Sequence, residues 1–268
     1  MKAMILAAGL GTRLRPLTDD RPKALVEING RTLLEITLSR LRSFGVREVM
    51  INVYHFADLI VECLKTNDNF GMRIEVSREE ALLDTGGGLK KAAYFFVEES
   101  GRSEEPFIVH NVDVISTIDL RRMVQFHTEN QALATLAVQD RKTSRYLLFD
   151  DHLQLCGRRS GADEPELVQS SPVRSSLPRS SQVRPSLVRS AQPLHALAFS
   201  GIHVISPRLL AMMVEDGAFS IVASYLRLAA QAEKILAFHA DEYYWRDLGN
   251  PENLAQAAQD LKQKVIPQ

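Results

Sequence analysis

Several features that mark particular classes of protein are scarce or absent in this sequence of 268 residues. Its two cysteines, Cys63 and Cys156, match no metal-binding spacing, so we expect reduced thiols in a cytoplasmic protein. A net charge of −1 argues against a general nucleic-acid binder. No apolar run approaches the roughly 18 residues of a membrane helix, and the first residues lack a signal-peptide pattern. With 45% hydrophobic residues, the chain suits a soluble globular enzyme.

Common catalytic and phosphate-binding signatures are also missing. The seven histidines show no zinc-type spacing. A dinucleotide-binding loop would need a third glycine where the sequence has Leu14, and no Gly-Lys-Ser/Thr sequence closes a Walker loop. The sequence therefore excludes the two commonest phosphate loops.

The most informative segment lies at the N-terminus. Residues 2–8 form a short apolar run that predicts a strand, and the run opens into a loop containing Gly9 and Gly11. The two glycines permit a tight turn and close approach of the backbone to a ligand. Arg13 and Lys23 follow and supply the positive charge that a triphosphate needs. We therefore predict a phosphate-binding loop.

Strand-like and helix-like segments alternate along the first half of the chain, which predicts an α/β fold with a mainly parallel sheet flanked by helices. Ligands of such sheets bind at the carboxyl ends of the strands. The expected strands are 4–8, 48–54, 73–77, 107–110, 132–139 and 198–205. The expected helices are 33–44, 57–65, 88–96, 118–130, 207–214, 221–232 and 253–262, with Pro251 at the start of the last one.

One segment, residues 163–192, breaks this pattern. Within it, arginines recur at positions 174, 179, 184 and 189, and serines at 176, 181 and 186. A five-residue period fits neither a strand nor a helix, and the density of serine and proline disfavours a packed core. We expect one domain over residues 1–262, interrupted by a low-complexity surface loop. A basic lid or docking segment for an anionic partner is the alternative interpretation.

The string LAAGLGTRLRPLT at residues 6–18, followed by Pro-Lys-Ala-Leu at 22–25, resembles the signature of the sugar-1-phosphate nucleotidylyltransferases. These enzymes join an NTP to a sugar phosphate and release pyrophosphate. The resemblance runs through residue 261 apart from the insertion. It implies one nucleotidyltransferase domain with a Rossmann-like, GT-A-like fold, acting on an NTP and a sugar 1-phosphate as a monomer or homodimer. The chain has no hexapeptide repeat, so no β-helix acetyltransferase domain is expected.

Nucleotidyl transfer builds negative charge on the α-phosphate and the departing pyrophosphate, and the family meets it with Mg²⁺. Asp113, in His-Asn-Val-Asp, resembles the metal-binding aspartate of the family's Asn-Gly-Asp motif, although Val112 replaces the glycine. Asp247, in Trp-Arg-Asp-Leu-Gly, resembles the second metal ligand. Without the N-terminal motif, an isolated aspartate at a strand end is more commonly a helix cap or a turn residue.

The remaining site residues are expectations that rest on the same resemblance. The expected catalytic residues are Arg13, Lys23 and Asp113. The expected nucleotide contacts are Leu6, Ala8, Gly9, Gly11, Thr12, Arg13, Lys23, Gly86 and Asn111, and the expected sugar contacts are Asn52, Arg145 and Gly201. We interpret the glycines at 86–88 as a loop that precedes a helix. The resemblance implies that this loop borders the nucleoside. Glu79 and Glu80 are candidates to read base edges.

Among compact members of the family, the resemblance favours UTP with N-acetylmuramate 1-phosphate. GTP with mannose or heptose 1-phosphate remains open, and CTP with choline phosphate is a weaker choice. A non-catalytic subunit that senses a nucleotide sugar is the alternative of a different class. It is motivated by Val112 and the insertion, whereas the retained Arg13, Lys23, Asp113 and Asp247 argue against it.

Overall fold

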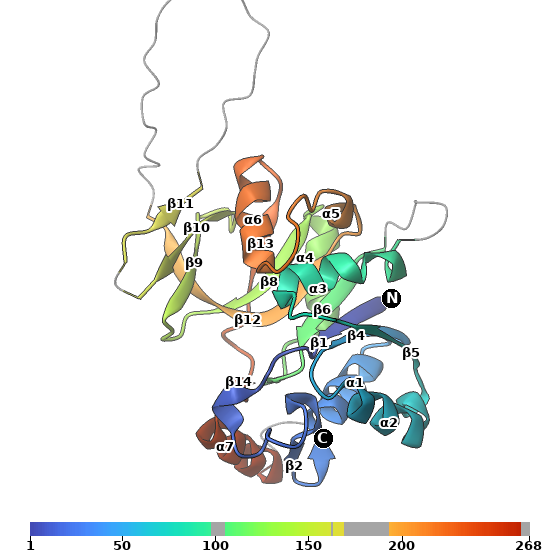
Figure 1. The fold of residues 1–268 in the computed structure, drawn as a ribbon. Helices are drawn as coiled ribbons and strands as arrows, with labels where there is room; N and C mark the ends of the chain where they lie inside the picture. The colour runs from blue at the N-terminus through green and yellow to red at the C-terminus, as the bar shows by residue number, and fades with distance from the viewer. Residues whose placement is uncertain (98–104, 162, 169–192, 264–268) are drawn as a thin grey trace, which may run out of the picture.

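The computed structural model describes residues 1–97, 105–161, 163–168 and 193–263 (Figure 1). The strands are β1 (Lys2–Leu6), β2 (Glu27–Ile28), β3 (Arg31–Thr32), β4 (Glu48–Val53), β5 (Arg73–Arg78), β6 (Phe107–Asn111), β7 (Val114–Ser116), β8 (Ala134–Gln139), β9 (Arg145–Phe149), β10 (Leu155–Ser160), β11 (Glu166–Leu167), β12 (His195–Ile205), β13 (Ile235–His239) and β14 (Trp245–Asp247). The α-helices are α1 (Leu33–Ser43), α2 (Ala57–Thr66), α3 (Asp84–Lys91), α4 (Leu120–Glu129), α5 (Arg208–Ala211), α6 (Ile221–Ala230) and α7 (Pro251–Lys262).

One large sheet organises these elements, in the order β11-β10-β9-β12-β6-β1-β4-β5, and β8 lies between β12 and β13. Strands β5, β4, β1 and β6 are parallel neighbours, as are β8 and β13. Strand β12 runs antiparallel to β6, β8 and β9. The predicted α/β fold with a largely parallel central sheet is confirmed, and an antiparallel extension through β9, β10 and β11 adds to it.

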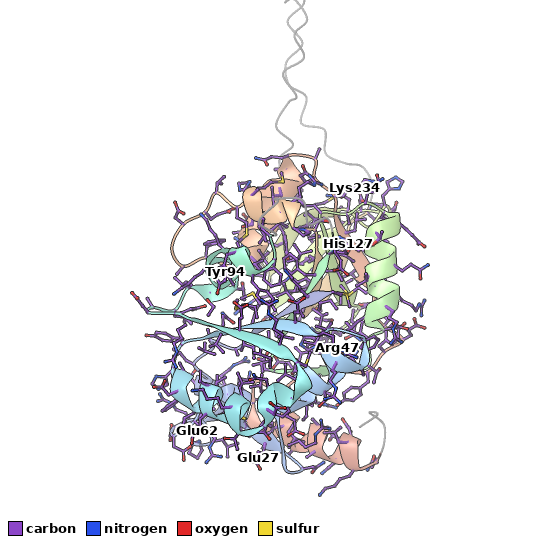
Figure 2. All side chains as sticks on the ribbon, turned by 90° about the vertical axis from the view of Figure 1, so that its right-hand side faces the viewer. Glu27, Arg47, Glu62, Tyr94, His127 and Lys234 are labelled. Atoms are coloured by element: carbon purple, nitrogen blue, oxygen red, sulfur yellow. The ribbon has the colours of Figure 1, made fainter. Side chains whose placement is uncertain are left out.

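Helices cover both faces of the sheet, because alternate side chains of each strand point to opposite sides. Ala3 and Ile5 of β1 join one buried cluster with residues of α1, α2, α4 and α7. Met4 joins the opposite cluster with residues of α3, α5 and α6. Figure 1 shows this three-layered arrangement, and in Figure 2 side chains fill the space on both faces of the sheet. The strand predicted from the N-terminal run is thus the buried centre of the fold.

Side-chain caps fix where three of the helices begin. Thr32 Oγ1 accepts a hydrogen bond from Glu35 N at the start of α1, and Asp119 caps α4. Asn250 Oδ1 accepts from Asn253 N at 2.8 Å, and Pro251 occupies the first turn of α7 as predicted.

Three local predictions differ from the structure. The helix expected at 88–96 begins earlier, at Asp84, and ends at Lys91, where a short 3₁₀ turn (Ala93–Phe95) follows it. The helix expected at 207–214 is the single turn α5. The sequence did not predict the strands β2, β3, β7, β9, β10, β11, β13 and β14, and β12 begins at His195 rather than 198.

Of the segment 163–192, the structure describes residues 163–168. There β11 pairs with β10, with Leu167 opposite Gly157. The arginine and serine repeat lies outside the described residues. Within the described ranges, no helix is long and apolar enough to cross a membrane.

Candidate active site

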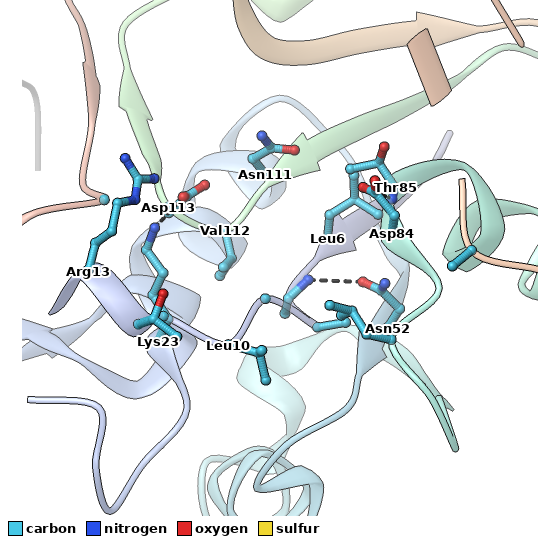
Figure 3. Close-up of a pocket in the computed structure, with 18 residues that line it drawn as sticks. Leu6, Leu10, Arg13, Lys23, Asn52, Asp84, Thr85, Asn111, Val112 and Asp113 are labelled. Atoms are coloured by element: carbon cyan, nitrogen blue, oxygen red, sulfur yellow. Dashed lines mark hydrogen bonds and ion pairs between the residues drawn. The ribbon is translucent and has the colours of Figure 1, made fainter. Parts of the chain in front are cut away.

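The ends of three parallel strands meet at one edge of the sheet. Leu6, the last residue of β1, is in register with Asn52 of β4 and with Asn111 of β6. The glycine loop leaves β1 at this point, as predicted for a ligand site at strand carboxyl ends. A cavity of about 560 Å³, which we call the loop cavity, lies there (Figure 3). It is lined by Leu6, Ala7, Ala8, Gly9, Leu10, Gly11, Thr12, Arg13, Lys23, Asn52, Leu82, Asp84, Thr85, Asn111, Val112, Asp113, Ala218 and Gly249.

The conformation of the loop requires a glycine at position 11. Gly11 has φ +66°, in the left-handed region that side chains disfavour. A Cβ there would lie 3.0 Å from Thr18 Cγ2 and 3.3 Å from Lys23 Cβ. Thr18 Oγ1 also donates a hydrogen bond to the Gly11 carbonyl at 2.9 Å. The loop is therefore folded tightly around the base of Lys23.

An ion pair joins two of the three expected catalytic residues. The ammonium of Lys23 contacts Asp113 Oδ2, and the two side chains are only 9% and 20% exposed. Arg13 is exposed and has no carboxylate within 4 Å in the described part of the chain. Figure 3 shows Lys23, Asp113 and Arg13 at one end of the loop cavity, with Asp84, Thr85 and Asn52 at the other. The cations thus gather at one end of the cavity.

Strand pairing brings Asp247 next to Asp113. Strands β14 and β7 are antiparallel, with Asp247 opposite Val114, and Leu248 N donates to the Asp113 carbonyl at 2.8 Å. Gly249 N in turn donates to Asp247 Oδ1 at 2.6 Å. The two aspartates expected to bind metal therefore lie on neighbouring backbone segments although they are far apart in sequence.

Gly249 lies close to two of the predicted site side chains. A Cβ at this position would lie 2.4 Å from Asp247 Oδ1 and 2.5 Å from Arg13 Nη2. Only glycine leaves room for both groups, which explains the last residue of the Trp-Arg-Asp-Leu-Gly string.

The donor set at Asp113 and Asp247 suits Mg²⁺. Lys23 engages Asp113 Oδ2 and Gly249 N engages Asp247 Oδ1, which leaves one oxygen of each carboxylate without a hydrogen bond within the described residues. No cluster of three or more His, Cys, Asp or Glu side chains able to hold a metal occurs in the described ranges. Mg²⁺ typically takes one or two carboxylates and completes its shell with phosphate oxygens and water. The site therefore fits an ion shared with a phosphorylated ligand.

A buried hydrogen-bond chain braces the opposite end of the loop cavity. Ala7 N donates to Asn52 Oδ1 at 2.9 Å, and Asn52 Nδ2 donates to Glu79 Oε1 at 2.7 Å. Glu79 Oε2 accepts from Leu83 N at 3.0 Å. Because both Glu79 oxygens are engaged and the side chain is buried, the prediction that Glu79 reads a base edge is wrong. Asn52, predicted to bind sugar, lines the loop cavity and holds its backbone.

The three glycines at 86–88 lie within α3. The prediction that they form a loop ahead of a helix is therefore wrong. A Cβ on Gly86 would lie 2.3 Å from the Phe219 ring, and one on Gly87 would lie 2.4 Å from the Gly217 carbonyl oxygen. A Cβ on Gly88 would lie 2.7 Å from Asn52 Nδ2. Gly86 N already donates to the Phe219 carbonyl at 2.9 Å. Close packing thus accounts for these glycines.

A second, larger cavity of about 930 Å³ adjoins the first, and we call it the arginine cavity. Arg13, Asp84, Thr85 and Asn111 line both cavities, so the two are continuous. Of the expected sugar contacts, Arg145 and Gly201 line the arginine cavity, whereas Asn52 does not. Its remaining lining residues are Val114, Arg141, Thr143, Ser144, Tyr146, Leu147, Arg158, Arg159, Ser160, Phe199, Ser200, His203, Ser220, Ile221, Val222, Trp245 and Asp247.

Three arginines of this cavity, Arg141, Arg158 and Arg159, were missed from sequence. Arg141 stacks on Trp245, with its guanidinium carbon 3.6 Å from the ring centre, and its Nη2 donates to the Phe199 carbonyl at 2.9 Å. Burial lowers the pKa of Arg141 below its usual value. Arg159 lies over Tyr146 at 5.2 Å. The basic cluster at 141–145 was the sequence signal that could have indicated Arg141. It indicates a cavity only when the positions of β9 and β10 are known.

Two buried histidines lie beneath the site. Burial, together with the nearby charge of Arg40, lowers the pKa of His110 to about 4. Burial lowers that of His203 to about 3, and Tyr225 Oη lies 2.7 Å from its Nδ1. Both are neutral near pH 7, so the positive charge of the arginine cavity comes from its arginines.

Comparison with known proteins agrees with this geometry. The nucleotidyl transferase family model matches residues 2–148. The chain is 32% identical over 259 residues to the N-acetylmuramate alpha-1-phosphate uridylyltransferase of Caulobacter vibrioides, covering 93% of this chain and 92% of that protein. It is 36% identical over 145 residues to the UTP–glucose-1-phosphate uridylyltransferase of Synechocystis sp., covering 51% of this chain and 36% of that protein.

Solved structures share the fold. HddC from Yersinia pseudotuberculosis complexed with GMP-PN aligns with a TM-score of 0.71 at 20% identity, covering 97% of this chain and 99% of that one. A UDP-glucose pyrophosphorylase complexed with UDP-glucose aligns with a TM-score of 0.71 at 16% identity, covering 98% of each chain. Identities this low establish the common fold alone.

Proposed function

Since the chain belongs to the nucleotidyl transferase family and is a sugar-1-phosphate nucleotidylyltransferase, we propose that it transfers the uridylyl group of UTP to N-acetylmuramate 1-phosphate with Mg²⁺. The observation that carries this proposal is the pair of continuous cavities with Lys23, Asp113 and Arg13 at one end of the loop cavity. Similarity to the Caulobacter protein over nearly its whole length supports the choice of substrates.

We assign the loop cavity to the nucleoside triphosphate. The glycine loop offers backbone close to the phosphates, and Arg13 and Lys23 offer charge. Asp84 and Thr85 line the far end, where the nucleoside would lie, and they replace Gly86 as the candidate contacts of that segment. The arginine cavity then receives the sugar phosphate.

The reaction needs positioning and charge rather than a protein nucleophile. An oxygen of the acceptor phosphate attacks the α-phosphorus of UTP in line, a P–O bond forms, and the bond to pyrophosphate breaks. Lys23, oriented by Asp113, stabilises the charge that develops on the α-phosphate, and Arg13 stabilises the leaving pyrophosphate. Mg²⁺ held by Asp113 and Asp247 would neutralise phosphate charge and align the two substrates.

GTP with mannose 1-phosphate is the second candidate pair. A mannose-1-phosphate guanyltransferase of Aspergillus fumigatus is 36% identical, but over 139 residues that cover 52% of this chain and 37% of that protein. That match is confined to about half of the chain, so it carries less weight for the acceptor. We place the reaction in the cytoplasm, and the free thiols of Cys63 and Cys156 are consistent with that compartment.

A pyrophosphate-release screen tests the proposal. Purified protein is incubated with and without Mg²⁺, with each of UTP, GTP, CTP, ATP and dTTP crossed with several sugar 1-phosphates, including those of N-acetylmuramate and mannose. We expect release that requires Mg²⁺ and is fastest for UTP with N-acetylmuramate 1-phosphate. Faster release with GTP and mannose 1-phosphate would refute the substrate assignment. Nucleotide binding by folded protein without any release would favour a sensing subunit.

A further inference from the structure

The arginine cavity carries more positive charge than a sugar monophosphate needs. Five arginines and two aspartates line it. Of the arginines, Arg158 is neutralised by Glu166, with Nε 2.6 Å from Oε2. Arg13, Arg141, Arg145 and Arg159 have no carboxylate within 4 Å anywhere in the described ranges. Arg141 and Arg159 are partly buried, and an unpaired cation in such a position is costly unless a bound anion offsets it.

The two stacked arginines occupy different parts of the cavity. Arg141 lies on Trp245, two residues before Asp247, and the charge of Asp247 acts on it. Arg141 is thus near the carboxylates that we assign to Mg²⁺, at the end where the acceptor phosphate must react. Arg159 belongs to β10 in the antiparallel extension, directly opposite Tyr146 of β9. We therefore assign Arg159 to a part of the acceptor other than the reacting phosphate.

Arg159 is held ready to donate a hydrogen bond. Its guanidinium lies over the Tyr146 ring, which restricts its orientation. Its Nε is buried and has no hydrogen-bond partner among the described residues. A buried donor without a partner is destabilising, and a bound ligand with a hydrogen-bond acceptor would satisfy it. A guanidinium suits a carboxylate, which can accept two parallel hydrogen bonds from it.

The arginine cavity also offers neutral polar groups. Ser200 Oγ and Asn111 Oδ1 are buried without hydrogen-bond partners within the described ranges, and both residues line the cavity. Hydroxyl and amide groups suit the hydroxyl or acetamido substituents of a sugar ring. The cavity therefore presents neutral polar groups as well as cations at two separate places.

We propose that Arg159 recognises a carboxylate on the acceptor, separate from the 1-phosphate, so that the enzyme selects acidic sugar 1-phosphates. This inference rests on the proposed nucleotidyl transfer and names the group that would set acceptor specificity. N-acetylmuramate 1-phosphate carries such a carboxylate on its lactyl ether, whereas N-acetylglucosamine 1-phosphate is the same sugar without it. The pair measures the contribution of the lactyl group as a whole, and the methyl ester of that group isolates the charge of its carboxylate.

The experiment compares kcat/KM for these two acceptors at saturating UTP. A charge-assisted hydrogen bond is worth about 1.5–3 kcal/mol, which corresponds to roughly 10- to 150-fold in kcat/KM. We expect Arg159→Met to lower kcat/KM for N-acetylmuramate 1-phosphate by that factor and to change it less than about threefold for N-acetylglucosamine 1-phosphate. Arg159→Lys keeps the positive charge but loses the parallel N–H donors of the guanidinium. It should therefore retain part of the preference for N-acetylmuramate 1-phosphate that Arg159→Met loses.

Two controls keep the test decisive. Arg73→Gln changes an exposed arginine of β5, at the opposite edge of the sheet, and should leave both acceptors unchanged. The methyl ester of the lactyl group removes the acceptor's charge without altering the protein, so wild-type enzyme should lose the same factor with it. This second measurement does not depend on how the variant folds.

Equal losses for both acceptors in Arg159→Met, or full activity with the methyl ester, would overturn the carboxylate assignment. A wild-type preference for N-acetylglucosamine 1-phosphate would also overturn it while leaving nucleotidyl transfer intact. Absence of turnover with every acceptor would instead refute the proposed function, so the two failures are distinguishable.

Discussion

Replacing Asp113 by Asn should lower both the catalytic rate and the free energy of unfolding. The ion pair with Lys23 determines the size of the stability loss. The substitution removes one carboxylate of the metal site and leaves the ammonium of Lys23, which is 9% exposed, without its partner. Breaking a fully buried pair in this way costs about 3–5 kcal/mol. Because the Asp113 side chain is 20% exposed, we expect a smaller loss than for a fully buried pair, about 2–3 kcal/mol.

For a chain of this size, such a loss lowers the melting temperature by about 5–10 °C. Turnover should fall at least about 100-fold, since the variant loses electrostatic stabilisation of the transition state. The assays are thermal unfolding for the melting temperature, urea unfolding for the free energy, and pyrophosphate release under saturating substrates. Arg13→Ala provides the contrast, because Arg13 is exposed and forms no ion pair with any described residue: activity should fall to a similar extent with the melting temperature nearly unchanged.

The double variant Lys23→Met/Asp113→Asn separates the two effects. Removing both charges should recover most of the lost stability, because no uncompensated ammonium remains, but it should not recover turnover. An Asp113→Asn variant as active as wild type would refute the catalytic assignment. A double variant no more stable than Asp113→Asn would refute the account of the pair.

Three further predictions concern Asp247 and the buried histidines. Gly249→Ala should lower kcat at least tenfold with little loss of stability, because the new Cβ would displace the mobile end of Asp247 rather than backbone; equal loss of both would contradict this. Stability should fall as pH decreases from about 6.5 towards 4, because the unfolded chain binds protons that His110 and His203 cannot bind when folded. At pH 5 the loss is about 2 kcal/mol per histidine, and urea midpoints that do not change between pH 7.5 and 5 would argue against it. Asp260, whose Oδ2 accepts from Tyr244 Oη at 2.6 Å, ties α7 to the segment that leads into Asp247. Asp260→Asn should therefore raise the Mg²⁺ concentration needed for half-maximal rate, and an unchanged requirement would mean that the contact only supports the fold.

The phosphate loop and the main strands were predictable because they depend on local signals. Apolar runs predicted β1 and β4, and Gly9 and Gly11 predicted the turn between β1 and its cations. Strands β9 and β13 are only five residues long, so their apolar patterns do not distinguish strand from helix. The start of α3 was missed because glycine disfavours helix, and here contacts with residues 217–219 override that preference.

The site itself was predicted only in part. The sequence supplied Lys23 and Asp113 separately, but their pairing depends on two loops that meet through the tertiary fold. The position of Asp247 follows from the pairing of β14 with β7, and no local sequence pattern predicts that pairing. Arg141, in the connection between β8 and β9, and Arg159, on β10, were missed for the same reason. A charged side chain in a loop or on a strand usually faces solvent, and these two line a cavity only in the tertiary fold.

The most direct test of the central claim is ³¹P NMR of UTP, Mg²⁺ and N-acetylmuramate 1-phosphate incubated with the wild-type enzyme or with Asp113→Asn. The account predicts equal amounts of a nucleoside diphosphate sugar and pyrophosphate with the wild-type enzyme, and at least about 100-fold slower formation of both with the variant. Hydrolysis of UTP without dependence on the acceptor, or equal rates for the two proteins, would contradict it.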